Sequence, residues 1–236
     1  MEENSPIGSP IQVGCLLIDD FALMSYSAVV EPLRAANLLA SRTIYEVRHY
    51  AVPGQRAESS GRLAVEGAVA VADDCNPDYL FVFAGGDPAR FQDERVFDWL
   101  RLLANRGVIL VGVSGGPVIL AAAGVMEGRR MTVHWEHAAV LAEASPNLFV
   151  ERTLYVIDRD RITCAGGIAP LDLMHALITE HCGGELAQKV SDWYMHTDIR
   201  PSGGPQRAGI AERYGTTNQT VVRAIEAMEN NIADPL

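Results

Sequence analysis

Ser114 is the residue whose surroundings most suggest chemistry. It follows an apolar run, residues 108–113, and precedes Gly115, Gly116 and Pro117. A serine between a buried strand and a glycine-rich helix start resembles a nucleophile elbow, in which the side chain is exposed and nearby helix amides can bind an anion or oxyanion. Serine and glycine are also common in helix caps and tight strand-to-helix turns, so a purely structural role stays open.

His134 is the candidate partner of Ser114. A histidine after the elbow helix could act as its general base, although a hydrogen-bonded histidine near a helix start is the simpler interpretation. His134 and His137 form an HxxH pattern. No third ligand is evident, so we expect neither a metal site nor a cofactor.

Three aromatic residues are candidates to line a pocket: Trp135, Trp193 and Tyr194. Aromatic faces attract a quaternary ammonium by cation–π interaction. Core packing is the more frequent use of such residues, and this alternative also stays open.

The elements that would position these residues alternate between strands and helices. Apolar runs at 13–19, 79–84 and 108–113 are typical of buried parallel strands, and 45–52 alternates like a strand. Helical spacing predicts helices over 24–40, 93–105, 116–124, 171–181, 185–196 and 216–230, with Pro32 marking a kink or a first turn. Residues 154–158 and 161–165 predict a hairpin. The pattern predicts an α/β fold of flavodoxin-like type, a mostly parallel sheet flanked by helices, with a C-terminal helical connector.

In such a sheet, ligands bind beyond the carboxyl ends of the strands. The three apolar runs end in small or polar residues: Asp19 and Asp20, then Gly85, Gly86 and Asp87, then Ser114, Gly115 and Gly116.

Composition excludes several classes of protein. Thirty acidic residues against 19 basic ones give a net charge of −11, which argues against this segment gripping nucleic acid or an anionic membrane. No apolar run approaches a membrane span, and residues 1–10 do not form a signal peptide. Cys15 and Cys164 lie in apolar runs without metal-type spacing, which predicts buried free thiols and fits a reducing cytoplasm.

The motifs together resemble the class I glutamine amidotransferase-like superfamily of the PfpI type. The resemblance rests on Gly85-Gly86, on Ser114-Gly115-Gly116-Pro117, on the segment AGVMEGRRMTVHWEH at 123–137, and on residues 163–168 with Asp172. It is closest to the effector domain that precedes the DNA-binding domain in one group of AraC-family transcription regulators. The resemblance implies a flexible tail over 1–11, an effector domain over 12–196, and a connector over 197–236. The connector would lead to a helix-turn-helix domain that is absent from this chain.

Two departures from the enzymes of this superfamily favour binding over turnover. Ser114 stands where active members place a cysteine, and a serine hydroxyl is far less acidic than a thiol. The acid that the enzymes supply from the first helix falls near Ser25, and Glu31 lies further along.

The resemblance therefore implies a non-catalytic sensor of a small nitrogenous metabolite: a betaine, carnitine, a methylated amine or arginine. We expect a cytoplasmic homodimer that binds DNA only through the helix-turn-helix domain. The expected ligand-binding residues are Asp19, Gly85, Gly86, Asp87, Ser114, Gly115, Gly116, His134 and Trp135. A carboxylate would lie on amides at Gly86, Ser114 and Gly115, and a cationic head would face Trp135. The alternatives are a PfpI-type hydrolase or hydratase using Ser114 and His134, and a pure interaction module.

Overall fold

A computed structural model describes residues 9–66, 68–71 and 74–230. The chain divides into two compact units, one ending at Gly204 and one beginning at Pro205. Each unit is described by itself.

The described part of the first unit holds a seven-stranded sheet in the order β3-β2-β1-β4-β5-β9-β8. Neighbouring strands are parallel except β8 and β9, which pair antiparallel as the predicted hairpin. The strands are β1 (Ile11–Leu17), β2 (Tyr45–Ala51), β3 (Val69–Ala70), β4 (Tyr79–Ala84), β5 (Ile109–Ser114), β8 (Tyr155–Asp158) and β9 (Arg161–Cys164). The predicted fold class, a mostly parallel α/β sheet flanked by helices, is confirmed.

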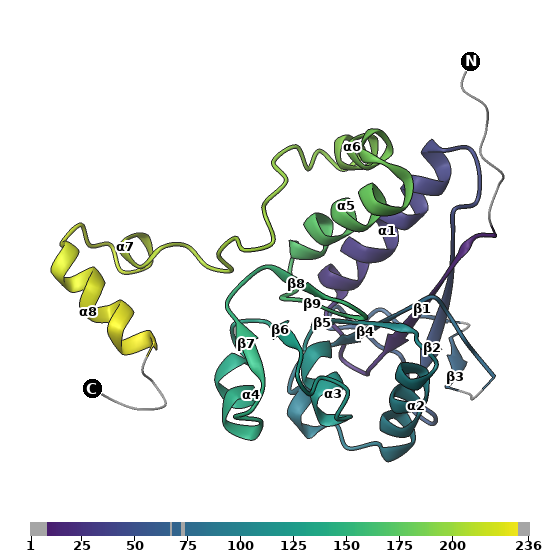
Figure 1. The fold of residues 1–236 in the computed structure, drawn as a ribbon, viewed down its shortest axis with the longest axis horizontal. Coiled ribbons are helices and arrows are strands. Elements are labelled where there is room, and N and C mark those ends of the chain that lie inside the picture. Colours follow the sequence, from purple (N-terminus) through teal and green to yellow (C-terminus); the bar gives the residue numbers. More distant parts are fainter. Residues whose placement is uncertain (1–8, 67, 72–73, 231–236) are drawn as a thin grey trace. The chain divides into compact units, whose positions relative to one another are not determined.

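Helices cover both faces of this sheet, with α1, α5 and α6 on one side and α2 and α3 on the other (Figure 1). Their bounds are α1 (Leu23–Leu39), α2 (Glu94–Asn105), α3 (Gly116–Ala122), α5 (Ala169–Cys182) and α6 (Gly184–Trp193). Pro32 lies inside α1, nine residues beyond its start, so the expectation of a first-turn position is wrong.

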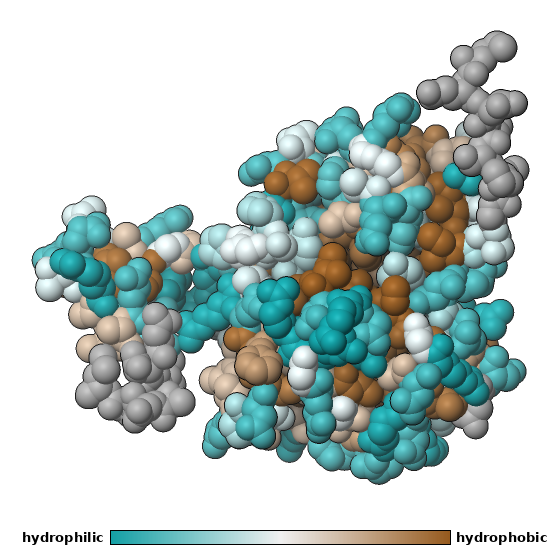
Figure 2. All heavy atoms as spheres, in the orientation of Figure 1, coloured by the Kyte–Doolittle hydropathy of each residue, from teal (hydrophilic) through white to brown (hydrophobic). Residues whose placement is uncertain are grey.

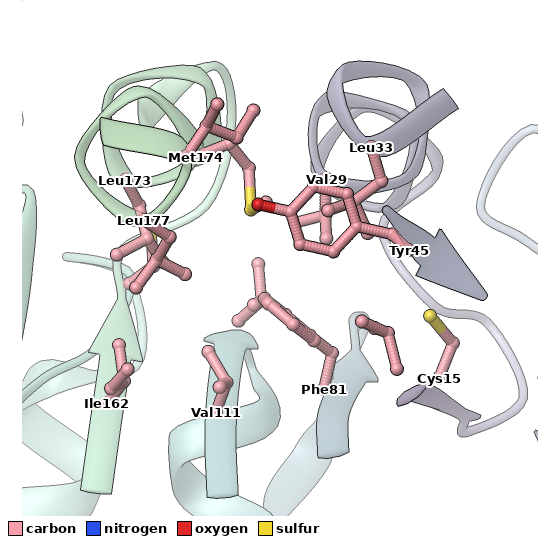
Figure 3. Close-up of a cluster of buried hydrophobic side chains, with 14 of the residues drawn as sticks. Cys15, Val29, Leu33, Tyr45, Phe81, Val111, Ile162, Leu173, Met174 and Leu177 are labelled. Carbon is pink, nitrogen blue, oxygen red and sulfur yellow. The ribbon is translucent and has the colours of Figure 1, made fainter. Parts of the chain in front are cut away.

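A buried hydrophobic cluster fills each face. On one face Val29 and Leu33 of α1 and Met174 of α5 point toward Phe81 and Val111 of the sheet (Figure 3). Continuous apolar strands are what a sheet covered on both sides requires. Cys15 and Cys164 are free and buried, as predicted.

Several short elements were not predicted. The strands β6 (Arg130–Thr132) and β7 (Phe149–Glu151) form a separate parallel pair, and α4 (Ala138–Ala144) lies between them in the chain. The short 3-10 helix η1 (Pro88–Arg90) lies between β4 and α2. Three-residue strands carry too few residues to show a period.

The first unit also extends further than the predicted effector domain. Residues 197–204 pack on it, because Ser202 O accepts hydrogen bonds from the amides of Leu154 (2.9 Å) and Tyr155 (3.4 Å). At the other end Ile11 already belongs to β1, while residues 1–8 of the predicted tail lie outside the described residues. The second unit holds α7 (Ile210–Arg213) and α8 (Gln219–Asn230) within the predicted connector.

On the face shown in Figure 2, hydrophilic residues cover much of the first unit and hydrophobic residues gather in smaller patches. Trp135 and Ile168, which follow β6 and β9, are among the exposed large apolar side chains.

Candidate functional site

Ser114 ends β5 in a left-handed backbone conformation, with φ +62°. This conformation costs a residue with a side chain about 1–2 kcal/mol. The turn after it is tight, because a Cβ on Gly116 would lie 2.0 Å from Val82 O. The strand-to-helix turn of the predicted elbow is therefore present and strained, but the exposed side chain that such an elbow implies is not, because Ser114 is buried.

A second loop lies against the elbow. Gly166, between β9 and α5, is so close to Ser114 that a Cβ on it would lie 2.7 Å from Ser114 Cβ and 3.0 Å from Ser114 Oγ. The contact leaves Ser114 only 7% exposed. The sequence showed a glycine pair here but not which residue it approaches.

His134 joins the elbow through its backbone. Its amide donates to Ser114 O at 3.4 Å. Among the described residues, no hydrogen bond joins the Ser114 hydroxyl to the His134 ring. The nucleophile–base contact of an acyl-transfer site is absent from this arrangement.

The His134 ring is neutral near pH 7. Burial lowers the pKa of His134, neighbouring His137 lowers it further, and the Glu136 carboxylate opposes both effects. A neutral imidazole is the form that a general base requires, so the charge state alone does not decide the role of this ring. The Glu136 amide donates to His134 Nδ1 at 3.4 Å. Because a neutral imidazole has one acceptor nitrogen and one donor, this bond favours the tautomer with the proton on Nε2. In this tautomer the acceptor nitrogen is occupied by Glu136, and Nε2 is a hydrogen-bond donor.

No carboxylate from the first helix completes a catalytic set. Ser25 is buried in the first turn of α1, and its hydroxyl has no hydrogen-bond partner among the residues that the structure describes. Glu31 is engaged elsewhere: its carboxylate pairs with Arg34 at 2.7 Å and accepts from the Tyr194 hydroxyl at 3.1 Å. Glu31 therefore does not substitute for the missing acid.

The amides expected to cradle a carboxylate are partly used. Gly115 N donates to Ala84 O at 3.1 Å, so this amide already has an acceptor within the protein. The amides of Gly86 and Gly116 make no hydrogen bond within the described part of the chain. Gly86 is exposed and Gly116 is buried.

The acids at this edge divide into two roles. Asp19 Oδ1 accepts from the Glu58 amide at 3.1 Å and so holds the loop after β2. Asp20 has φ +64°, and its Oδ2 would lie 2.5 Å from a Cβ on Gly86. Asp20, which the sequence marked as a strand end but not as a ligand residue, is thus the acid that lies over Gly86. A ligand carboxylate at Gly86 would meet its negative charge.

Asp87 adds a second exposed acid beside Gly86. It lies 3.8 Å from the exposed Arg90 and is close enough to His137 to raise the pKa of that ring. Burial has the larger and opposite effect on His137, so the pKa of His137 is lowered and its ring adds little positive charge near pH 7.

Trp135 is 45% exposed, with its ring 5.3 Å from that of His134. The other two aromatic candidates lie elsewhere. Tyr194 follows α6 and its hydroxyl donates to Glu31 O of α1 at 2.7 Å. Trp193 is the last residue of α6 and is 49% exposed.

These residues lie near the point where the strand order of the sheet reverses. β2 lies on one side of β1 and β4 on the other, and β5 and β9 follow. The carboxyl ends of β1, β4, β5 and β9 carry Asp20, Gly86, Ser114 and Gly166. Ligands of doubly wound sheets bind at this switch point.

The described residues contain no group of three histidine, cysteine or carboxylate side chains that could hold a metal ion. An open groove is lined by Gln55 and by residues 90–95, and none of the elbow residues lines it.

These features define the class of the protein: an open, mostly parallel α/β sheet with a strained residue at a strand-to-helix turn. The chain belongs to the DJ-1/PfpI family, whose family model matches residues 13–180. It is 42% identical over 226 residues to the HTH-type transcriptional regulator GlxA of Rhizobium meliloti, covering 95% of this chain and 70% of that protein. It is 38% identical to the HTH-type transcriptional regulator CdhR of Pseudomonas aeruginosa, covering 94% of this chain and 66% of that protein.

A solved structure agrees. The crystal structure of an AraC family transcriptional regulator from Pseudomonas putida matches with a TM-score of 0.71 and 26% identity, over 78% of this chain and all of that one. The predicted resemblance to the PfpI-type domain of AraC-family regulators is confirmed. In the described part of the chain, no helix combines the length and apolar character needed to cross a membrane.

Proposed function

We propose that this chain senses a small molecule within an HTH-type transcriptional regulator and binds it without chemical turnover. The observation that carries the proposal is the state of Ser114. It occupies the strained elbow position, but its hydroxyl makes no hydrogen bond to His134 and no carboxylate of α1 accompanies it. An activated serine needs a base within hydrogen-bond reach, so this observation also disfavours the hydrolase or hydratase alternative.

The charges around the elbow favour a cationic ligand. Asp20 and Asp87 are exposed acids at one end, and the His134 and His137 rings are neutral near pH 7 because burial lowers their pKa values. The partly exposed Trp135 ring would add cation–π attraction. We propose that an ammonium head lies between Asp20 and Trp135.

The other end of the site offers donors. His134 Nε2 and the Gly116 amide both suit an oxygen of a carboxylate. A ligand with an ammonium group and a carboxylate, such as a betaine, carnitine or arginine, matches both ends. This orientation differs from the expectation that the ligand carboxylate lies on the Gly86 amide. Because the Asp20 carboxylate lies over Gly86, we propose that the cationic group lies there instead.

The proposal extends to the whole regulator. Ligand binding here would shift an equilibrium that a helix-turn-helix DNA-binding domain reads, in a cytoplasmic homodimer.

A thermal-shift screen tests the ligand class. We expect glycine betaine, dimethylglycine, carnitine or arginine to raise the melting temperature, since a ligand that binds only the native state stabilises it. Asp20→Asn should weaken the affinity of the responding compound by about tenfold, because it removes one charge contact and asparagine tolerates positive φ.

The matched control is Glu127→Gln. Glu127 is an exposed acid in the turn after α3. This turn lies near Arg161, the first residue of β9, because Arg161 Nε donates to Val125 O. This turn lies at the opposite end of β9 from Gly166, so the substitution should leave affinity unchanged. Equal affinity loss in the two variants, or no response to any compound, contradicts the proposed ligand class.

A further inference from the structure

Residues 196–204 form a strap that closes the first unit immediately before the second unit begins at Pro205. The strap has no helix or strand over its length. Side-chain and backbone contacts therefore hold it in place, at two points.

The first anchor is Asp172, in the first turn of α5. Its Oδ1 accepts from His196 Nε2 at 2.8 Å and from the Arg200 amide at 2.9 Å. Its Oδ2 accepts from Arg200 Nε at 3.0 Å and Nη2 at 2.6 Å. Asp172 is completely buried. A buried carboxylate is tolerated only when its charge and lone pairs are satisfied, and here strap residues supply the donors.

The second anchor is Leu154, just before β8. Its amide and that of Tyr155 donate to Ser202 O. A Cβ on Gly204 would lie 3.0 Å from Leu154 Cδ1, so the strap passes directly over this side chain.

The first anchor connects to the elbow through one loop. Gly166 lies against Ser114, and Gly166 O accepts from the Ala169 amide at 3.1 Å, at the start of α5. Asp172 follows within the same helical turn. Ser114 is therefore connected to Asp172 through a short segment of chain, residues 166–172.

The second anchor connects to both sides of the site. Ala165 N, beside Gly166, donates to Leu154 O at 2.8 Å. Thr132, two residues before His134, donates through Oγ1 to Thr153 O and through its amide to Thr163 Oγ1, each at 2.8 Å. Movement at either Ser114 or His134 thus has a hydrogen-bonded path to the strap.

We infer that the strap is the output element of this unit: the occupancy of the Ser114–His134 site changes how firmly Asp172 and Leu154 hold residues 196–204. The inference rests on the proposed sensing function and names its regulation. Asp172 and Arg200 are positioning residues, and the two sites are coupled reciprocally.

Hydrogen–deuterium exchange on the 236-residue chain, without any ligand, tests this coupling. Gly166→Ala places a methyl group against Ser114. Gly167→Ala is the matched control, because Gly167 also has positive φ (+60° against +92°) but nothing within 4 Å of its Cβ position. We expect Gly166→Ala to speed exchange of the strap amides, including that of Arg200, by about fivefold or more relative to Gly167→Ala.

The reverse direction keeps the test decisive if Gly166→Ala does not fold. Arg200→Lys removes the two-pronged contact with Asp172 and should speed exchange in residues 111–120, whereas Arg34→Lys, which weakens the comparable contact with Glu31, should not. Folded variants whose strap and elbow exchange stay at control values overturn the inference. Because no ligand is used, this result is independent of the thermal-shift screen, so failure of the proposed function and failure of the coupling are distinguishable.

Discussion

At the residue scale, the neutral state of two histidines shapes the site. Burial is the main cause that lowers the pKa values of both His134 and His137 in the folded chain. Their neutrality leaves the Asp20 carboxylate and the Asp87 carboxylate, which lies 3.8 Å from Arg90, as charges at this edge.

The same shifts predict how stability depends on pH. Histidine has a pKa near 6.5 when unfolded, so between that value and the lower folded value the unfolded chain binds more protons than the folded one. The free energy of unfolding should therefore fall as the pH falls below about 6.5. The double variant His134→Asn/His137→Asn should lose part of this dependence.

Urea unfolding at a series of pH values between 7.5 and 5.5 measures the effect in wild type and variant. An unchanged slope in the double variant would mean that neither ring is buried and neutral in solution.

The residue scale is also where sequence reasoning was least complete. Asp19 and Asp20 both follow β1, and no pattern distinguishes the acid that holds Glu58 from the acid that lies over Gly86. The use of the Gly115 amide by Ala84 O depends on the path of the turn, which propensity does not give.

At the element scale, the elbow depends on how closely α3 approaches β4. Gly116 is the first residue of α3, and any side chain there would collide with Val82 O. This approach places the Gly116 amide beside Ser114.

Gly116→Ala should consequently destabilise the fold by about 3 kcal/mol, at the upper end of typical overpacking costs. Gly184→Ala is the matched control, because Gly184 is the first residue of α6 and has nothing within 4 Å of its Cβ position. Chemical denaturation should show a change of about 0.5 kcal/mol or less for that control. Similar destabilisation by both would contradict the close approach.

Elements were predicted well where a period or an apolar run was long. The runs that became β1, β4 and β5 are buried on both faces, and such strands are recognisable from composition alone. β6 and β7 escaped prediction although β6 leads to His134, since their three residues show no pattern.

At the scale of the whole molecule, the connection between the first unit and the second is the basis of the control that we propose for the site. The strap that Asp172 and Leu154 hold leads without interruption into the second unit. Asp172 and Arg200 are 28 residues apart in sequence, and only the folded chain brings them together. The sequence predicted a polar connector there, while the packing of residues 197–204 on the first unit required the structure.

The relatives place this architecture in a regulatory setting. The chain aligns over nearly its whole length with HTH-type transcriptional regulators and spans 70% and 66% of two of them. We propose that the elbow of the DJ-1/PfpI fold in this chain binds an effector and leaves it chemically unchanged.

Calorimetric titration of wild type and Ser114→Ala with the compound that responds in the thermal-shift screen tests this claim most directly, with mass spectrometry of the compound after prolonged incubation. We expect the two dissociation constants to lie within about threefold of each other, because the amides and His134 rather than the Ser114 hydroxyl bind the ligand. We also expect the compound to be recovered intact from both proteins. Conversion of the compound by wild type, lost in Ser114→Ala, would contradict this claim.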